Sequence, residues 1–171
     1  MSEDNLSQYS AYIGLDWADT KHDVCVQSAE SGEREFSVVN HNPTALDEWV
    51  KGLRKRFGGM IAVAVELSKG PIVSVLQRYD FIVIFPINPS TLAKYREAFQ
   101  PSGAKDDPTD AELALDLLVR HPHRFKPLQP QGAEIRTLAT LVEHRRQQVN
   151  DKIRVTNRLR AIFKEYYPQI L

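Results

Sequence analysis

The sequence predicts an α/β protein: a mixed five-stranded sheet with flanking helices, followed by a long helical segment. Two observations lead to this class. Short apolar runs alternate with stretches of helical spacing, in the order strand, strand, strand, helix, strand, helix, strand, and then helices. Residues 131–167 contain no proline, and no glycine after Gly132, which predicts one long helix or a bent helix pair.

The first three strands are predicted to pair as an antiparallel meander. Residues 12–16 form an apolar run typical of a buried strand. Residues 22–28 alternate polar and apolar side chains, as a half-buried strand does, and residues 33–40 follow after a turn. Residues 1–10 are polar and acidic, so we expect them to form a flexible tail.

Helices and apolar strands alternate in the next part of the chain. The apolar residues between Pro43 and residue 56 recur at helical spacing, which predicts a helix. Residues 61–65 and 81–85 are short apolar runs typical of strands, with a helix predicted over residues 72–79 between them. The second run is wholly apolar, which usually indicates a central strand covered on both faces.

Only helices are predicted after these strands. A short helix is expected over residues 91–99 and another from Pro108 to about residue 120. Residues 121–127 are rich in proline and histidine and predict a linker. We therefore expect one domain over residues 11–126 and a separate helical segment over residues 127–171.

The long C-terminal helix carries a weak heptad of apolar residues. Its members recur at alternating spacings of three and four residues: Ile135, Leu138, Val142, Val149, Leu159, Phe163 and Tyr166. Arg145, Lys152 and Thr156 occupy the same seam and interrupt it. Coiled coils tolerate some polar seam residues at a cost in stability. A coiled coil that joins subunits is therefore expected, and a helix packed on its own domain is the alternative.

Composition limits the classes of protein. Lys and Arg number 22, as do Asp and Glu, so the formal net charge is zero. This balance argues against a generally basic nucleic-acid coat but allows a local basic surface. The single cysteine, Cys25, cannot form an internal disulfide, which fits a reducing compartment. No apolar run approaches the roughly 20 residues that span a membrane. We expect a cytoplasmic protein.

Two of the acidic residues lie at predicted strand ends. Asp16 closes the first apolar strand, and Glu66 follows residues 61–65. Burial of a carboxylate there costs several kcal/mol of desolvation free energy unless something pairs with it. Oxygen-rich sites of this kind suit Mg²⁺ or Mn²⁺. Taken singly, each residue has an ordinary alternative, since a strand-end Asp often caps a turn and a strand-end Glu is usually solvated.

Asp107 and Asp110 flank a predicted helix start. Asp107 is well placed as an N-cap before Pro108, and Asp110 would then lie in the first turn. That account needs no metal. The spacing of three residues also puts both carboxylates on one helix face, where they can share a cation. Both interpretations remain open on spacing alone.

Basic residues are concentrated in the long helix. They are Arg136, Arg145, Arg146, Lys152, Arg154, Arg158, Arg160 and Lys164, against Glu143, Asp151 and Glu165 over the same stretch. A solvated helix face is the default explanation. The alternative is a surface that contacts the nucleic-acid backbone, because phosphate contacts require only well-placed cations.

The joint pattern of these segments resembles a known family. GLDWADTKHDV, AVELSKGP and AKDDPTDAELA are similar to motifs of the DEDD-type insertion-sequence transposases, relatives of the Piv DNA invertase. The resemblance extends over residues 11–167. The acidic positions of the family correspond to Asp16, Glu66, Asp107 and Asp110, and Lys105 and Ala111 complete the last motif.

This resemblance implies several properties. The fold would be RNase-H-like (RuvC-like), with Asp16, Glu66, Asp107 and Asp110 holding Mg²⁺ or Mn²⁺ for DNA strand cleavage and recombination. Lys105 and the long helix would contact DNA and a guide (bridge) RNA, and the helix would join subunits of a homo-oligomer. Family members also carry a C-terminal domain with a serine, and this chain stops at Leu171. We expect it to be the N-terminal carboxylate-bearing part of a transposase.

Two other functions stay open on the sequence. The chain could be a non-catalytic module that binds nucleic acid and oligomerises through residues 131–167. It could also be a stand-alone RuvC-like nuclease that acts on branched DNA.

Overall fold

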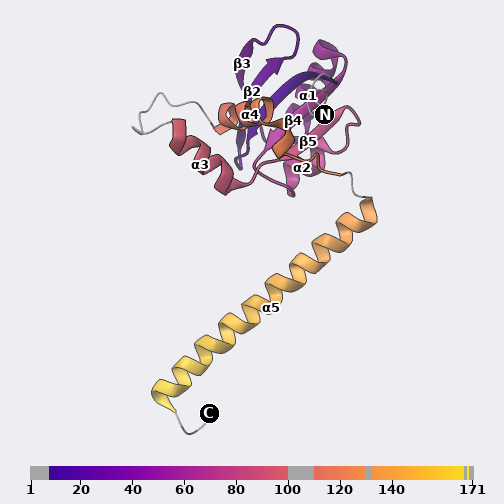
Figure 1. Ribbon diagram of the computed structural model, residues 1–171. Coiled ribbons are helices and arrows are strands. Elements are labelled where there is room, and N and C mark those ends of the chain that lie inside the picture. Colours follow the sequence, from indigo (N-terminus) through magenta and orange to yellow (C-terminus); the bar gives the residue numbers. More distant parts are fainter. Residues whose placement is uncertain (1–7, 100–109, 130–131, 168, 170–171) are drawn as a thin grey trace. The chain divides into compact units, whose positions relative to one another are not determined.

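The computed structural model describes residues 8–99, 110–129, 132–167 and 169. The chain divides into two compact units, Met1–Leu128 and Gln129–Leu171. The first unit contains a five-stranded sheet with helices packed on it (Figure 1). The predicted α/β class and mixed five-stranded sheet are confirmed, and the arrangement is consistent with an RNase-H-like fold.

The predicted antiparallel meander is present. It consists of β1 (Tyr9–Asp16), β2 (Lys21–Ser28) and β3 (Arg34–Asn40). β1 begins three residues earlier than predicted, so Tyr9 and Ser10 belong to the sheet and not to the expected tail. Burial explains the difference, because the Tyr9 ring packs edge-on against Tyr12 and Phe85.

The remaining strands are parallel to β1. They are β4 (Met60–Val65) and β5 (Ile82–Pro86), and the strand order is β3-β2-β1-β4-β5. The expected central position of the last apolar run is wrong, since β5 lies at the edge of the sheet. Its residues are apolar because both faces of the strand are covered, and not because it lies between two other strands. Part of its edge is also covered, because the Leu128 backbone N–H donates to the Ile84 carbonyl at 2.7 Å.

Helices cover both faces of the sheet (Figure 1). Two of them, α1 (Pro43–Phe57) and α2 (Pro71–Leu76), pack on the face that carries Ile13, Val63 and Ile84. On the opposite face, which carries Tyr12, Cys25 and Ala64, lies α4 (Asp110–Arg120). Beside it lies α3 (Pro89–Phe99), whose Leu92 joins the same apolar core. The short helix η1 (Pro122–Arg124) follows α4.

Gly14 allows α4 to approach the sheet very closely. A Cβ atom at this position would lie 1.8 Å from the Ala111 carbonyl oxygen and 2.7 Å from the Leu115 backbone nitrogen. No real side chain fits such distances, so the backbone of α4 rests directly on β1. The glycine therefore fixes where the first turn of α4 meets the end of β1.

The second unit is one long helix, α5 (Ala133–Tyr166). Its large apolar residues are largely exposed, with Leu138 61% and Val142 59% accessible to solvent. Among the described residues, none of the helices combines the length and apolar content needed to cross a membrane.

Candidate functional site

Two predicted carboxylates lie at neighbouring strand ends. Asp16 is the last residue of β1, and Glu66 directly follows β4. The two strands are parallel and Leu15 pairs with Val65, so Asp16 and Glu66 are the next residues in register. Because side chains alternate along a strand, both lie on the face of Gly14 and Ala64, which is the face that α4 covers.

The third predicted carboxylate comes from α4. Asp110 opens this helix, one residue before Ala111, whose carbonyl oxygen lies against Gly14. The close packing at Gly14 therefore brings the start of α4 to the end of β1, two residues from Asp16. We call Asp16, Glu66 and Asp110 the carboxylate site.

The electrostatics of Asp16 show that these residues act on one another. Burial raises the pKa of the Asp16 carboxyl above its ordinary value of 3.8. The negative charges of Asp110, Asp23 and Glu66 raise it further, and the positive charge of Arg96 lowers it. The ionised form of Asp16 is therefore disfavoured by its surroundings, a pattern common at functional sites.

Asp23 is a carboxylate that the sequence reasoning missed. It lies in β2 directly opposite Asp16 in the antiparallel register and shares the face of Cys25. A strand over residues 22–28 puts Asp23 and Cys25 on one face, but the sequence does not give the register with β1. Without that register, nothing indicated that Asp23 faces Asp16.

Arg96 is the second missed residue. Its Nε donates to Asp110 Oδ1 at 2.9 Å, and a terminal guanidinium nitrogen forms an ion pair with the same oxygen. Both side chains are partly exposed, 42% for Arg96 and 32% for Asp110. One fixed positive charge thus stands among several negative ones.

The donor chemistry of the carboxylate site fits a divalent cation. A shared cation would offset the negative charges that raise the pKa of Asp16, and carboxylate oxygens are ligands that Mg²⁺ and Mn²⁺ accept. As the side chains stand, however, the described residues contain no group of three His, Cys, Asp or Glu placed to hold a metal ion. Asp107 and Lys105 lie outside the described residues.

A buried histidine supports the backbone just after Asp16. His22 is fully buried, and its Nδ1 accepts a long hydrogen bond of 3.4 Å from the Ala18 backbone N–H. Its Nε2 lies 2.9 Å from His41 Nδ1, and the Trp17 ring stacks on it. Burial lowers the pKa of His22, and the nearby His41 lowers it further. The neutral ring therefore serves as packing for this loop.

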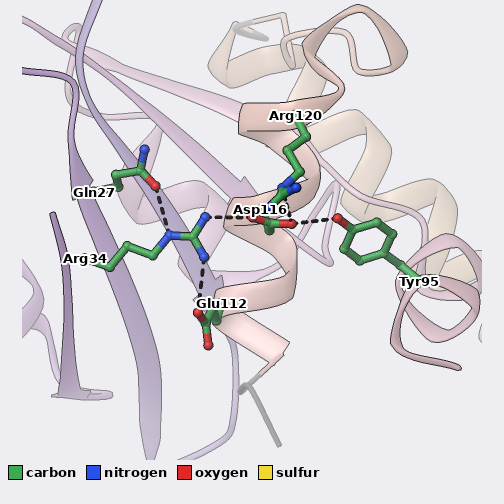
Figure 2. Close-up of polar contacts among 6 residues, drawn as sticks. All are labelled: Gln27, Arg34, Tyr95, Glu112, Asp116 and Arg120. Atoms are coloured by element: carbon green, nitrogen blue, oxygen red, sulfur yellow. Dashed lines mark hydrogen bonds and ion pairs between the residues drawn. The ribbon is translucent and has the colours of Figure 1, made fainter. Parts of the chain in front are cut away.

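A second acidic group lies further along α4 and is fully paired (Figure 2). We call its six residues the Asp116 cluster: Gln27, Arg34, Tyr95, Glu112, Asp116 and Arg120. The Arg34 guanidinium donates to Asp116 at 2.7 Å and to Glu112 at 3.1 Å. Tyr95 and Arg120 donate to the other Asp116 oxygen, at 2.6 and 2.8 Å. The cluster ties α4 to β2, β3 and α3.

The predicted basic residues of α5 are all exposed where their side chains are described. They are Arg145, Arg146, Lys152, Arg154, Arg158, Arg160 and Lys164, while the side chain of Arg136 lies outside the described residues. Two carry local ion pairs, Arg146 with Glu143 and Arg154 with Asp151. At about 3.6 residues per turn, these positions fall on more than one side of the helix. They do not form a single stripe.

A family model and similar curated proteins all indicate the same family for this chain. The model for DEDD transposases of the IS110 type, described as a transposase, matches residues 13–168. Among similar curated proteins, "Putative transposase y4uE" of Sinorhizobium fredii is 31% identical over 99% of this chain and 48% of that protein. "Mini-circle putative transposase for IS117" of Streptomyces coelicolor is 28% identical over 100% of this chain and 41% of that protein. The chain spans less than half the length of these relatives.

Proposed function

The chain belongs to the family of DEDD insertion-sequence transposases, and from this premise we propose that it is the carboxylate-bearing part of a transposase. In this proposal Asp16, Glu66, Asp107 and Asp110 hold a divalent metal, Mg²⁺ or Mn²⁺, for DNA strand cleavage and recombination. Family membership supports metal dependence and DNA binding in general terms. The metal identity and the individual ligands are parts of the proposal.

One observation supports the proposal most strongly. Asp16 is partly buried, and Glu66 and Asp110, which come from other elements, act on its charge. Residues 50 and 94 positions away along the chain thus influence the charge of one carboxylate at the end of β1. A fold that assembles mutually repelling carboxylates in this way gains most when a cation binds between them.

The residues have separate tasks in this proposal. Asp16 and Glu66 are held by adjacent parallel strands and provide rigid oxygen donors. Asp110 comes from a helix terminus, whose position is set by the contact of Ala111 with Gly14. A bound divalent cation supplies Lewis-acid stabilisation of the oxygens that react at a phosphodiester. The chain's own contribution is to orient the donors, and the charge of a bound cation would favour the ionised form of Asp16.

Nucleic acid and a second subunit are the proposed partners. Lys105 and the basic residues of α5, which are exposed where they are described, would contact DNA and a guide (bridge) RNA, and such contacts weaken with salt. The exposed apolar heptad of α5, including Leu138 and Val142, supports a coiled coil between subunits. Residues 127–171 would then be the oligomerisation segment, and residues 11–126 the RuvC-like domain.

Calorimetric titration with Mn²⁺ or Mg²⁺ tests this function. The chain should bind the cation, and Asp16→Asn should abolish binding because one rigid donor and its charge are lost. Asp80→Asn is the matched control, since Asp80 is exposed and lies just before β5, at the other end of the sheet. Cation binding that is unchanged in Asp16→Asn would contradict the proposal.

The exposed face of α5 favours a second candidate, a binding and assembly module without catalysis of its own. Gel shifts with duplex DNA and structured RNA over a range of salt concentrations distinguish the two. Nucleic-acid binding that persists when Asp16, Glu66, Asp107 and Asp110 are all replaced by amides, with no cation binding in the unmodified chain, would favour the module.

A further inference from the structure

Two consecutive residues of α3 bind two carboxylates of α4. Tyr95 donates to Asp116 at 2.6 Å, while Arg96 holds Asp110 through two nitrogens. Asp110 and Asp116 are six residues apart, roughly 9 Å along a helix axis. The Tyr95 contact lies within the fully paired Asp116 cluster and anchors α3. Arg96 is thereby positioned at the carboxylate site by a neighbour that has a structural role.

Arg96 and a divalent cation would compete for the same carboxylate. Both described contacts of the guanidinium with Asp110 go to Oδ1. A metal ligand must present its oxygen to the metal, and a guanidinium cannot coordinate a metal because it carries only N–H donors. Asp110 can therefore offer both of its oxygens to a cation beside Asp16 and Glu66 only when Arg96 releases Oδ1.

A phosphate group can replace the Asp110 carboxylate as the partner of the Arg96 guanidinium. The planar guanidinium fork binds phosphate and carboxylate with the same two-pronged geometry. The Arg96 side chain is 42% exposed, so it can reach a ligand from solvent without unfolding α3. A backbone phosphate that arrives at the site would pair with Arg96 and leave the Asp110 oxygen to a cation.

We propose that Arg96 is a positioning residue that exchanges Asp110 for a backbone phosphate of bound nucleic acid, and so couples nucleic-acid binding to metal binding. This inference rests on the proposed function of the carboxylate site. Its consequence is that the site gains affinity for metal when a nucleic-acid strand is present. By linkage, metal must raise the affinity for the strand by the same factor.

Mn²⁺ titrations followed by electron paramagnetic resonance test the coupling, with and without a short single-stranded oligodeoxynucleotide. In the unmodified chain the oligonucleotide should tighten Mn²⁺ binding about tenfold, within the usual range of coupling. Arg96→Gln should bind Mn²⁺ several-fold more tightly without oligonucleotide, and the oligonucleotide should add nothing. Arg96→Lys keeps the charge but loses the fork, so it should keep only part of the coupling.

Arg78→Gln is the matched control, because Arg78 is exposed and follows α2, before β5 begins. It should behave as the unmodified chain does, and thermal melts establish that every variant is folded. Unchanged or weaker Mn²⁺ binding by folded Arg96→Gln, or coupling that persists in it, overturns the inference. So does Mn²⁺ binding without coupling in the unmodified chain. If Asp16→Asn still abolishes Mn²⁺ binding, the proposed function survives. No Mn²⁺ binding under either condition overturns both.

Discussion

The two ends of α4 carry acidic groups of opposite character. Near its C-terminal end, the buried carboxylate of Asp116 accepts hydrogen bonds from Arg34, Tyr95 and Arg120 (Figure 2). At its N-terminal end, Asp110 is paired with Arg96 and faces the repelling charge of Asp16. Both carboxylates belong to the same helix on the same face of the sheet. The difference between them therefore lies in how many positive charges and hydrogen-bond donors surround each one.

The pKa directions express the same difference. Burial alone raises the pKa of Asp116, but hydrogen bonds from Arg34, Tyr95 and Arg120 outweigh it and leave the pKa below its ordinary value. The pKa of Asp16 is raised, because burial and three negative neighbours outweigh Arg96. A carboxylate satisfied by the chain stabilises the fold, whereas a carboxylate left in excess of the chain's cations is suited to binding one from solution.

Removal of Asp116 should have the largest effect on stability. Asp116→Ala leaves the Arg34 and Tyr95 donors without their buried acceptor, and we expect a loss of about 3 kcal/mol in the free energy of unfolding. Urea denaturation measures the loss. Asp80→Ala, an exposed control, should stay within about 0.5 kcal/mol of the unmodified chain. A loss below about 1 kcal/mol for Asp116→Ala would contradict the structural role of the cluster.

Substitution of Gly14 by alanine should cause the next largest loss of stability. Gly14→Ala forces α4 away from β1, because the new Cβ would meet the Ala111 carbonyl, and the expected loss is about 2 kcal/mol. Gly52→Ala is the control with the opposite sign. Gly52 lies in α1 with open space around it, so alanine should add about 0.5–1 kcal/mol. Equal effects of the two substitutions in urea denaturation would show that α4 does not rest on Gly14.

Neutralisation of Asp16 should raise stability slightly. Asp16→Asn removes the repulsion from Asp110, Asp23 and Glu66, so the free energy of unfolding at pH 7 should increase by less than about 1 kcal/mol after solvent screening. Urea denaturation without divalent cations measures this gain. A clear loss would mean that Asp16 is a structural carboxylate like Asp116.

The smallest expected effect is a difference between Asp16 and Asp116 in how their contributions to stability depend on pH. The pKa of Asp116 is lowered in the folded chain, so its stabilisation is present above its ordinary value of 3.8 and is lost as pH falls through the folded pKa. The pKa of Asp16 is raised, so its contribution is most favourable below 3.8 and is lost as pH rises through the folded pKa.

Stability measured against pH for the two asparagine variants checks these signs. The advantage of Asp16→Asn over the unmodified chain should vanish as pH falls below 3.8. The deficit of Asp116→Asn should shrink only as pH falls further, through the lowered pKa of Asp116. If stability depended on pH in the same way in both variants, the proposed difference between Asp16 and Asp116 would be wrong.

Hydrophobic pattern was sufficient to predict most of the fold. The alternation in residues 22–28 and the apolar runs around them predicted the strands and their antiparallel meander, because burial on one or two faces leaves a local signature. It misplaced β5 at the centre of the sheet, since a run covered on both faces looks the same at an edge. It also missed Tyr9 and Ser10 as part of β1.

The site was only partly predictable. Strand ends and a helix start made Asp16, Glu66 and Asp110 candidates, and the family resemblance joined them into one site. That they hold a metal stays a prediction. Asp23 and Arg96 depend on strand register and on the packing of α3 against α4, and neither leaves a local pattern. The role of Gly14 likewise depends on its distance to Ala111, which only the structure gives.

The most direct test of the central claim is anomalous diffraction from crystals of this chain soaked in Mn²⁺. The account predicts one or two anomalous peaks at the shared end of β1 and β4, each from a Mn²⁺ ion bound by carboxylate oxygens of Asp16, Glu66 and Asp110. Peaks confined to other surface carboxylates, with none at Asp16, would contradict it.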